Sequence, residues 1–127
     1  MIFPVLRMNF SFNRTIIMKL AIIGSRNCPP IHIEDFLTEI PDAIISGGAK
    51  GVDTYAREFA KRHNIPLIEF LPEYNKYASR VAPIVRNRQI VETCDQVLAF
   101  WDGTSHGTKF SIDYSRKLGK SVQIVKI

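Results

Sequence analysis

The sequence predicts an α/β fold in which a five-stranded, mainly parallel sheet carries helices on both faces, as a three-layer sandwich. Short apolar runs of strand length alternate along the chain with amphipathic segments of helical length. Three of the apolar runs lead into polar loops that contain glycine. Because a strand–helix–strand connection is right-handed, this alternation specifies a parallel sheet that is covered on both sides.

The first half of the chain contains two predicted strands and two predicted helices. Residues 19–23 form a nearly continuous apolar run that ends at Gly24, which is typical of a strand buried on both faces. Residues 33–40 carry apolar side chains at helical spacing, and Pro41 would end that helix. A second strand over 43–46 and a second helix over 52–63 follow.

The second half repeats the alternation around one long loop. Residues 72–82 form the longest irregular stretch, and long loops in compact domains are often functional. The remaining predicted elements are a strand over 66–71, a helix over 81–94, a strand over 96–100, a helix over 107–118 and a strand over 121–126.

Length and composition indicate one domain. The chain has 127 residues, of which 46% are hydrophobic, enough for one core and too few for two. No apolar run approaches the roughly 20 residues of a transmembrane helix, so we expect no membrane partner. Residues 1–17 lack the apolar core of a signal peptide, and we expect a poorly ordered N-terminal extension there and the domain over 18–127. Alternatively, residues 15–18 lengthen the first strand.

Charge, cysteine and histidine usage limit the classes of partner. The net charge is +5, and residues 1–17 contribute Arg7 and Arg14 without an acid, which leaves 15 basic against 12 acidic residues, or +3. This mild excess permits an anionic partner without requiring one. The two cysteines, Cys28 and Cys94, fit no disulfide framework, so we expect a reducing, cytoplasmic location and a core position for Cys94. The three histidines lack ligand spacing, and no metal site is predicted.

The loop over residues 46–53 is the strongest functional signal. Three glycines within five residues, Gly47, Gly48 and Gly51, lie between a predicted strand and a predicted helix. Glycine lets main-chain N–H groups approach an anion closely, and the helix N-terminus adds its positive end. A second loop of this kind spans 102–108, and a shorter turn spans 24–26.

The expected strand order brings these three loops together. In an open parallel sheet the ligand crevice lies at the carboxyl ends of the strands, where the order reverses. With the order 3-2-1-4-5, the reversal falls between the first and fourth strands. We therefore expect a ligand bound by Gly24, Ser25, Arg26, Ser46, Gly47, Gly48, Ala49, Gly51, Val52, Asp53, Asn87, Arg88, Trp101, Asp102, Gly103, Ser105, His106, Gly107 and Thr108.

Several of these residues also have a purely structural interpretation. Ser46 and Thr108 are suited to cap helices, with the same geometry that would bind phosphate. Asp53 is either a first-turn acid favoured by the helix dipole or a contact for a sugar hydroxyl. Arg26 is expected to pair with phosphate or with a loop carboxylate.

Other residues near the crevice are assigned by their position. Arg86 is expected to be a solvated charge, whereas Asn87 or Arg88 turns toward the crevice. Trp101 is favoured as a packing residue over a base-stacking one. His106 is expected to be a loop donor, because no partner carboxylate for acid–base work is identifiable. Because the three loops contain no glutamate and no catalytic constellation, binding is favoured over turnover.

The motifs resemble those of the SLOG superfamily of Rossmann-like nucleotide-binding domains, most closely its YspA-like (YpsA-related) branch. The likeness runs from Met18 to the C-terminus. It rests on Gly24-Ser-Arg26, Ser46-Gly-Gly-Ala-Lys-Gly-Val-Asp53, Pro72 with the tyrosine-rich loop, Arg86-Asn-Arg88 with Val91, and the run from Asp95 to Thr108. The resemblance implies a nucleotide or nucleotide-derived ligand that is sensed or processed.

Two more distant resemblances suggest alternatives. The chain is similar to DNA-processing protein A, which binds single-stranded DNA and shares the Ser-Gly-x-Ala-x-Gly-hydrophobic-Asp and Arg-Asn-Arg patterns. It also resembles LOG-type enzymes, which release bases from nucleoside monophosphates with a glutamate in Gly-Gly-x-Gly-Thr-x-x-Glu. Here Ser111 stands three positions after Thr108, with Asp113 two residues further, so the catalytic glutamate is absent.

The expected function is therefore binding of a small nucleotide ligand of the ADP-ribose, NAD or nucleoside monophosphate type, with no certain cofactor. We expect a homo-oligomer, with a dimer as the first choice. One alternative is single-stranded nucleic-acid binding through Arg57, Lys61, Arg62, Arg80 and Arg86. The other is hydrolysis of a nucleotide N-glycosidic bond, which would need a carboxylate from Asp53, Glu73, Glu92 or Asp102.

Overall fold

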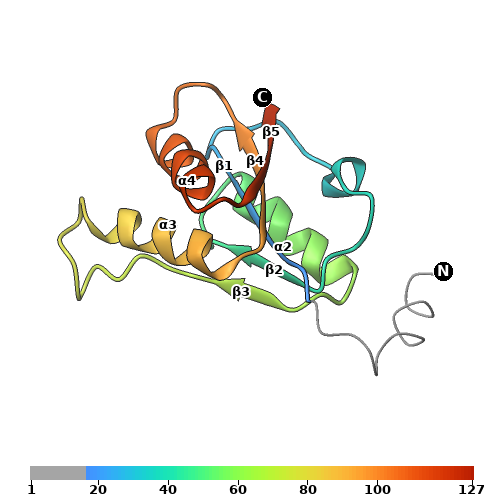
Figure 1. Cartoon of the computed structure of the whole chain (residues 1–127), viewed down its shortest axis with the longest axis horizontal. Coiled ribbons are helices and arrows are strands. Elements are labelled where there is room, and N and C mark those ends of the chain that lie inside the picture. Colours follow the sequence, from blue (N-terminus) through green and yellow to red (C-terminus); the bar gives the residue numbers. More distant parts are fainter. Residues whose placement is uncertain (1–16) are drawn as a thin grey trace.

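The computed structural model describes residues 17–127 and contains the predicted α/β fold (Figure 1). Five strands form one sheet in the order β3-β2-β1-β4-β5, and every neighbouring pair is parallel, which confirms the prediction. The strands are β1 (Lys19–Gly24), β2 (Ala43–Ser46), β3 (Leu67–Glu69), β4 (Gln96–Trp101) and β5 (Ser121–Lys126), and the helices are the 3-10 helix η1 (Ile33–Phe36), α2 (Val52–Arg62), α3 (Ala82–Thr93) and α4 (His106–Lys117).

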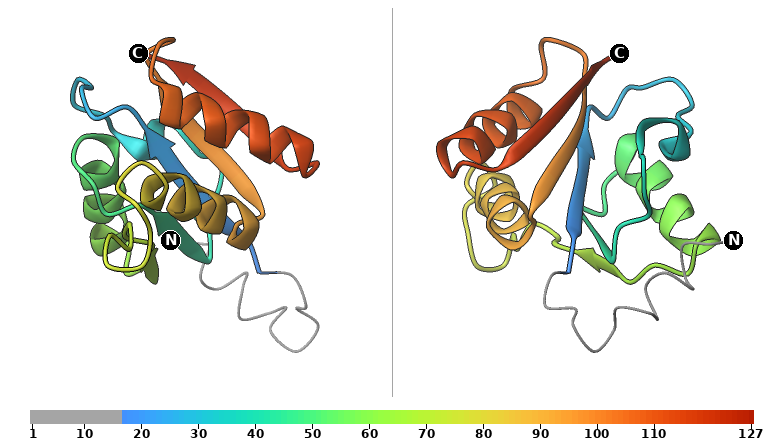
Figure 2. Two further views of the ribbon diagram at one scale, coloured as in Figure 1. Left: turned by 90° about the vertical axis from the view of Figure 1, so that its left-hand side faces the viewer. Right: turned by 45° about the vertical axis from the view of Figure 1, so that its right-hand side comes forward.

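The sheet separates two apolar cores, which makes the three layers visible in Figure 2. Successive side chains of a strand point to opposite faces. Leu20 and Ile22 of β1 therefore pack with η1 and α2, whereas Ala21 and Ile23 pack with α3 and α4. Cys94, just after α3, is buried in the second core, as expected.

The prediction of a helix over residues 33–40 is wrong. Only Ile33–Phe36 are helical, as one 3-10 turn, and Leu37 has an extended backbone. The apolar side chains nevertheless reach the core, with Ile33 fully buried and Leu37 and Ile40 packed against it. A segment this short is marginal as an isolated helix, so core contacts determine its conformation instead.

The strand predicted over 66–71 is also too long, because β3 contains only Leu67–Glu69. As an edge strand it pairs only with β2, which has four residues and offers three register partners. The other strands and helices agree with their predicted bounds to within two residues.

The start of the chain lies mostly outside the described residues, so the predicted extension over 1–17 is described only at Ile17, which is exposed. Neither Ile17 nor Met18 belongs to β1, although the Met18 N–H donates to Asp42 Oδ2 at 2.7 Å. Across residues 17–127, none of the helices combines the length and the apolar character needed to cross a membrane.

Lys120, which directly precedes β5, stabilises the C-terminus of α3. Its ammonium group donates to the carbonyl oxygens of Val91 at 2.7 Å, Glu92 at 3.3 Å and Cys94 at 2.5 Å. The last carbonyl groups of a helix have no intrahelical partner, and a cation also favours the negative end of the helix dipole.

We predict that Lys120→Met lowers the free energy of unfolding by about 1–2 kcal/mol, because three carbonyl groups lose a charged donor. Urea unfolding followed by circular dichroism measures the change. Lys117→Met is the matched control, since Lys117 is exposed at the end of α4 and should change stability by less than about 0.5 kcal/mol. Equal stability of the two variants would contradict this capping role.

Candidate ligand-binding site

A cavity of about 340 Å³ lies at the carboxyl edge of the sheet, where the strand order reverses between β1 and β4. Four segments line it: the end of β1 with the loop after it, the β2–α2 loop with the start of α2, one face of α3, and the β4–α4 loop with the start of α4. Its volume lies at the lower end of the roughly 300–1,000 Å³ typical of small-molecule sites.

Eleven of the residues predicted from the sequence line this cavity, and they come from all four segments. They are Gly24, Ser25, Arg26, Gly47, Ala49, Asp53, Asn87, Asp102, Ser105, Gly107 and Thr108. Eight others do not line it, namely Ser46, Gly48, Gly51, Val52, Arg88, Trp101, Gly103 and His106.

Seven lining residues were not predicted as ligand contacts, and Arg86 is the most important. The prediction that Arg86 is a solvated charge is wrong, because Arg86 is only 9% exposed. A signal was present: Ala82, Arg86 and Ile90 follow one another at intervals of four, and all three are buried on one face of α3. The other six are Ile23, Asn27, Lys50, Pro83, Ile90 and Ser111.

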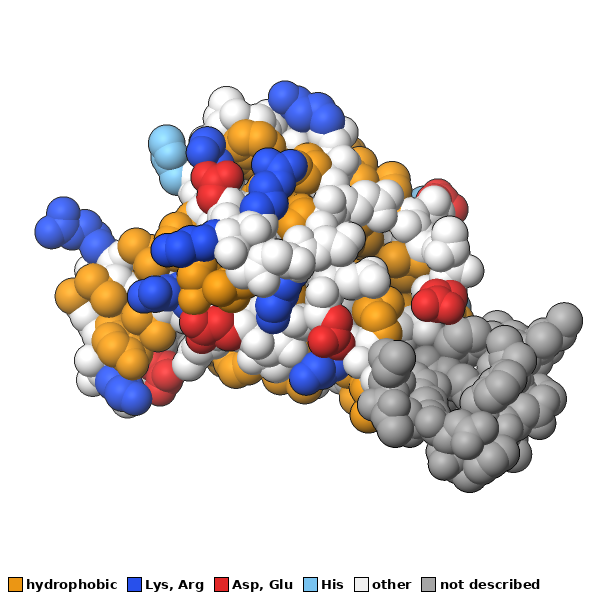
Figure 3. All heavy atoms as spheres, viewed as in Figure 1, with side chains coloured by type: hydrophobic (Ala, Val, Ile, Leu, Met, Phe, Trp, Pro, Cys, Tyr) orange, Lys and Arg blue, Asp and Glu red, His pale blue; other side chains and the backbone are white. Residues whose placement is uncertain are grey.

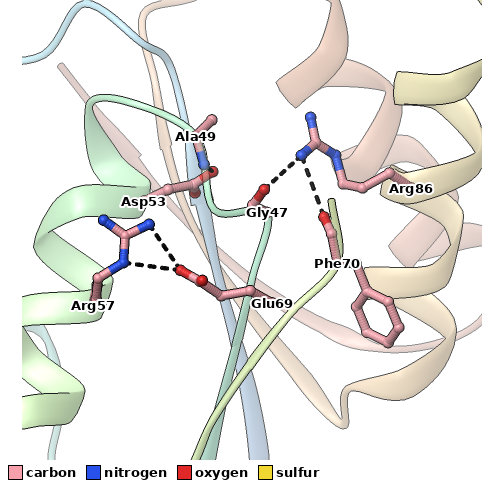
Figure 4. Close-up of polar contacts among 7 residues, drawn as sticks. All are labelled: Gly47, Ala49, Asp53, Arg57, Glu69, Phe70 and Arg86. Atoms are coloured by element: carbon pink, nitrogen blue, oxygen red, sulfur yellow. Dashed lines mark hydrogen bonds and ion pairs between the residues drawn. The ribbon is translucent and has the colours of Figure 1, made fainter. Parts of the chain in front are cut away.

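The guanidinium of Arg86 is held by two main-chain carbonyl groups (Figure 4) and by the side-chain amide of the neighbouring Asn87, rather than by an acid. Its Nη1 donates to the Gly47 carbonyl oxygen at 2.8 Å and to that of Phe70 at 3.4 Å, and its Nε donates to Asn87 Oδ1 at 2.8 Å. No carboxylate of the described residues lies within 4.0 Å of it. Burial lowers the pKa of Arg86, but an arginine remains protonated in proteins.

Asp53, in the first turn of α2, is the second charged group buried at the cavity, at 9% exposed. Its Oδ2 accepts the Ala49 N–H at 3.0 Å. Burial raises the pKa of Asp53, even though the Ala49 hydrogen bond, the Ser46 hydroxyl and the charge of Arg86 oppose this. The Ser46 oxygen is fully buried and faces this carboxylate without a hydrogen bond of normal geometry.

Asp102 has a different environment, because both of its carboxylate oxygens accept hydrogen bonds from its own loop. Oδ1 accepts the N–H groups of Thr104 at 2.8 Å and Ser105 at 2.7 Å, and Oδ2 accepts the Ser105 hydroxyl at 2.7 Å. These hydrogen bonds hold the pKa of Asp102 well below its usual range. Asp102 therefore remains an anion that shapes the loop.

The Ser25 hydroxyl joins the loops after β1 and β4 across the crevice. It lies 2.9 Å from the Ser105 hydroxyl and accepts the Asp102 N–H at 3.3 Å. The first backbone hydrogen bond of α4 is donated by Lys109 to Ser105. The N–H groups of Gly107 and Thr108 precede it in the first turn, where helical N–H groups lack intrahelical partners, and both residues line the cavity.

Two of the three loop glycines serve packing rather than the cavity. Gly51 has a φ of +75°, and a Cβ there would overlap the carbonyl oxygens of Arg26 and Ser25. Gly48 has a φ of +66°, and its Cβ would lie 2.6 Å from Leu71 Cδ2. Gly51 thus lets the start of α2 lie directly against the loop after β1, which brings Arg26 to the cavity.

The remaining predicted residues lie in structural positions outside the cavity lining. Trp101 packs against the second core and donates from Nε1 to the Ser105 carbonyl oxygen at 3.0 Å. Arg88 lies over the ring of Tyr114, 5.4 Å from its centroid. Val52 is buried in the first core, and His106 is exposed.

Comparison with known proteins adds no assignment: no family model, no curated protein and no solved structure matches this chain significantly. Within residues 17–127 there is also no grouping of three His, Cys, Asp or Glu side chains that could hold a metal ion.

We predict that Gly51→Ala is much more destabilising than Gly119→Ala. Both glycines have a φ of +75°, but a Cβ on Gly119 meets nothing within 4 Å. Gly119→Ala should therefore show only the backbone strain of about 1–2 kcal/mol, and Gly51→Ala should add a steric overlap with two carbonyl groups. Thermal unfolding of both variants gives the comparison, and equal losses would show that the close approach at Gly51 is unimportant.

Proposed function

We propose that this cavity binds a nucleotide or a nucleotide-derived ligand through an anionic phosphate group. The observation that carries the proposal is the environment of Arg86. A charged group this deeply buried is costly unless it is paired, yet no described carboxylate forms an ion pair with it. Its Nη2 donates none of the hydrogen bonds that hold the side chain, so it is free to bind an anion in the cavity.

Other groups around the cavity also favour an anion. Arg26 and Lys50 line it together with Arg86, against two carboxylates, Asp53 and Asp102. The Asp102 carboxylate is already engaged by three hydrogen bonds from its own loop. The positive end of α4 reaches the same space through Gly107 and Thr108.

A nucleotide is favoured over other anions by the position of the cavity and by the motifs. The carboxyl edge of a parallel sheet at a point of strand reversal is where nucleotides bind in this fold class. The motifs resemble the SLOG superfamily, to which we propose that the chain belongs. A volume of about 340 Å³ suits a mononucleotide, or one half of ADP-ribose or NAD, better than a whole dinucleotide.

The single-stranded nucleic-acid alternative receives less support. Arg57 and Arg62, two of the basic residues on which it rests, form ion pairs with Glu69 and Glu34, both at 2.9 Å. Arg86 is buried. On the face seen in Figure 3, basic side chains alternate with acidic and apolar ones and form no continuous track.

Of the four carboxylates that could serve the hydrolase alternative, one remains a candidate. Glu73 and Glu92 do not line the cavity, and Glu92 accepts the hydroxyl of Tyr114 at 2.5 Å. The low pKa of Asp102 makes it a poor proton acceptor. Asp53 alone combines a place in the cavity with a raised pKa, so any turnover of a bound nucleotide would depend on it.

We predict that calorimetric titration with AMP, ADP-ribose and NAD finds a ligand whose affinity falls at least tenfold in Arg86→Gln and in Arg26→Gln. Each variant removes a cation from the cavity, and a lost charged contact to phosphate is worth about 1.5–3 kcal/mol. Arg26 is exposed, so Arg26→Gln should fold normally and shows the effect even if Arg86→Gln is unstable.

Arg116→Gln is the matched control, because Arg116 is exposed in the last turn of α4 and does not line the cavity. Its affinity should equal that of the wild type. A thymidine homopolymer titrated at two salt concentrations tests the nucleic-acid alternative, and chromatography of the AMP sample for free adenine tests hydrolysis. Absence of binding by all three nucleotides would overturn the proposal.

A further inference from the structure

Arg86 and Asp53 approach the cavity from opposite sides of Gly47, and we call the surface they form the Arg86–Asp53 wall (Figure 4). A Cβ on Gly47 would lie 2.6 Å from Arg86 Nη1 and 3.0 Å from Asp53 Oδ2, so both charged groups crowd one glycine. Each side chain is more than nine-tenths buried. The glycine thus leaves just enough room for two opposite charges to share one wall.

The two charges are close but do not neutralise each other by direct contact. No carboxylate oxygen of the described residues, including those of Asp53, lies within 4.0 Å of a nitrogen of Arg86. An anion that pairs with Arg86 must therefore enter the same space that the Asp53 carboxylate faces. Two negative groups at one buried site cannot both remain charged without a large penalty, so one proton is bound together with the anion. Beside sulfate, whose conjugate acid is much stronger than a carboxylic acid, this proton goes to Asp53.

We propose that an oxyanion binds at the Arg86–Asp53 wall together with one proton, which Asp53 takes up from solvent. The neutral carboxyl group then donates a hydrogen bond to an oxygen of the ligand. Oδ1 is the oxygen that carries this proton, because Oδ2 accepts the Ala49 N–H. Asp53 would thereby select ligands that offer an acceptor oxygen beside the charge, as phosphate and sulfate groups do.

The groups around Asp53 favour this proton uptake. Burial and the charge of Glu69, on β3, raise the pKa of Asp53 before any ligand is present, and the opposing influences come from Ala49, Ser46 and Arg86. Arg57 donates two hydrogen bonds to the Glu69 carboxylate, at 3.1 Å and 2.9 Å. The positive charge of Arg86 lowers the pKa of Asp53, and an anion bound beside Arg86 would offset that effect. The pKa of Asp53 would therefore rise further when the anion binds.

The remaining ionisable groups near this wall do not replace Asp53 as the proton acceptor. Asp102 has a low pKa and hydrogen bonds on both oxygens. Burial and the Asp53 charge raise the pKa of the Cys28 thiol, which therefore stays neutral and has no proton to gain. Arg26 and Lys50, also at the cavity, are basic side chains rather than acids.

The test is calorimetric titration with inorganic sulfate, which stays doubly ionised between pH 6 and pH 8, in two buffers of different ionisation enthalpy. We expect about one proton to be taken up per sulfate bound, and affinity to rise by up to tenfold for each pH unit lowered between the pKa of Asp53 in the complex and its lower pKa in the free protein. AMP is titrated in parallel, although its phosphate has a proton equilibrium of its own near pH 6.

Asp53→Asn should bind sulfate at least as tightly as the wild type at pH 8, with no proton uptake and no pH dependence. This variant should fold, because the amide oxygen still accepts the Ala49 N–H. A carboxyl group with a raised pKa in the folded state destabilises the protein as pH rises through that pKa, so the asparagine variant should unfold at a higher temperature at pH 8.

Glu58→Gln is the control, because Glu58 lies on the same helix as Asp53 but is exposed and outside the cavity lining, and this variant should retain proton uptake. The inference rests on the proposed function only in requiring an anionic ligand. Binding of sulfate without proton uptake would overturn the inference and leave the proposed function intact. Failure of sulfate and AMP to bind would overturn the inference, and failure of ADP-ribose and NAD as well would overturn the proposed function.

Discussion

The buried positive charge of Arg86 is the constraint on which the rest of the site depends. A guanidinium that is 9% exposed must be compensated, and the protein supplies carbonyl oxygens of Gly47 and Phe70 rather than an ion pair. These two carbonyls belong to the ends of neighbouring strands, so Arg86 also joins α3 to the edge of the sheet. The same side chain is thus a structural tie and an unneutralised charge, and this combination makes the cavity a site for an anion.

The parallel sheet explains why the other groups gather around this charge. Its order reverses between β1 and β4, so the loops that leave these strands diverge and open a crevice. Ser25 and Ser105 meet across it at 2.9 Å, and Gly51 lets α2 lie against the loop after β1. The N-terminus of α4 completes the surface, and the Asp102 carboxylate is engaged by hydrogen bonds from its own loop.

The fold was predictable because strand–helix alternation leaves few topologies, whereas the errors arose where two structures share one pattern. Residues 33–40 carry helical spacing, but their apolar side chains reach the core from a 3-10 turn and extended backbone. Gly48 and Gly51 lie in a loop whose glycines are typical of a phosphate-binding loop. Only the structure shows that neighbouring atoms leave no room for a Cβ at either position. Arg86 was missed because a charge on a helix is usually solvated, and its buried partners, Gly47 and Phe70, are remote in sequence.

The most direct test of the account is a crystal structure of the protein grown with a saturating concentration of AMP. The account predicts phosphate density in the cavity, with an oxygen within about 3 Å of the Arg86 guanidinium, which keeps its hydrogen bond to the Gly47 carbonyl. An empty cavity, a nucleotide bound elsewhere, or an Arg86 side chain turned out to solvent would contradict it.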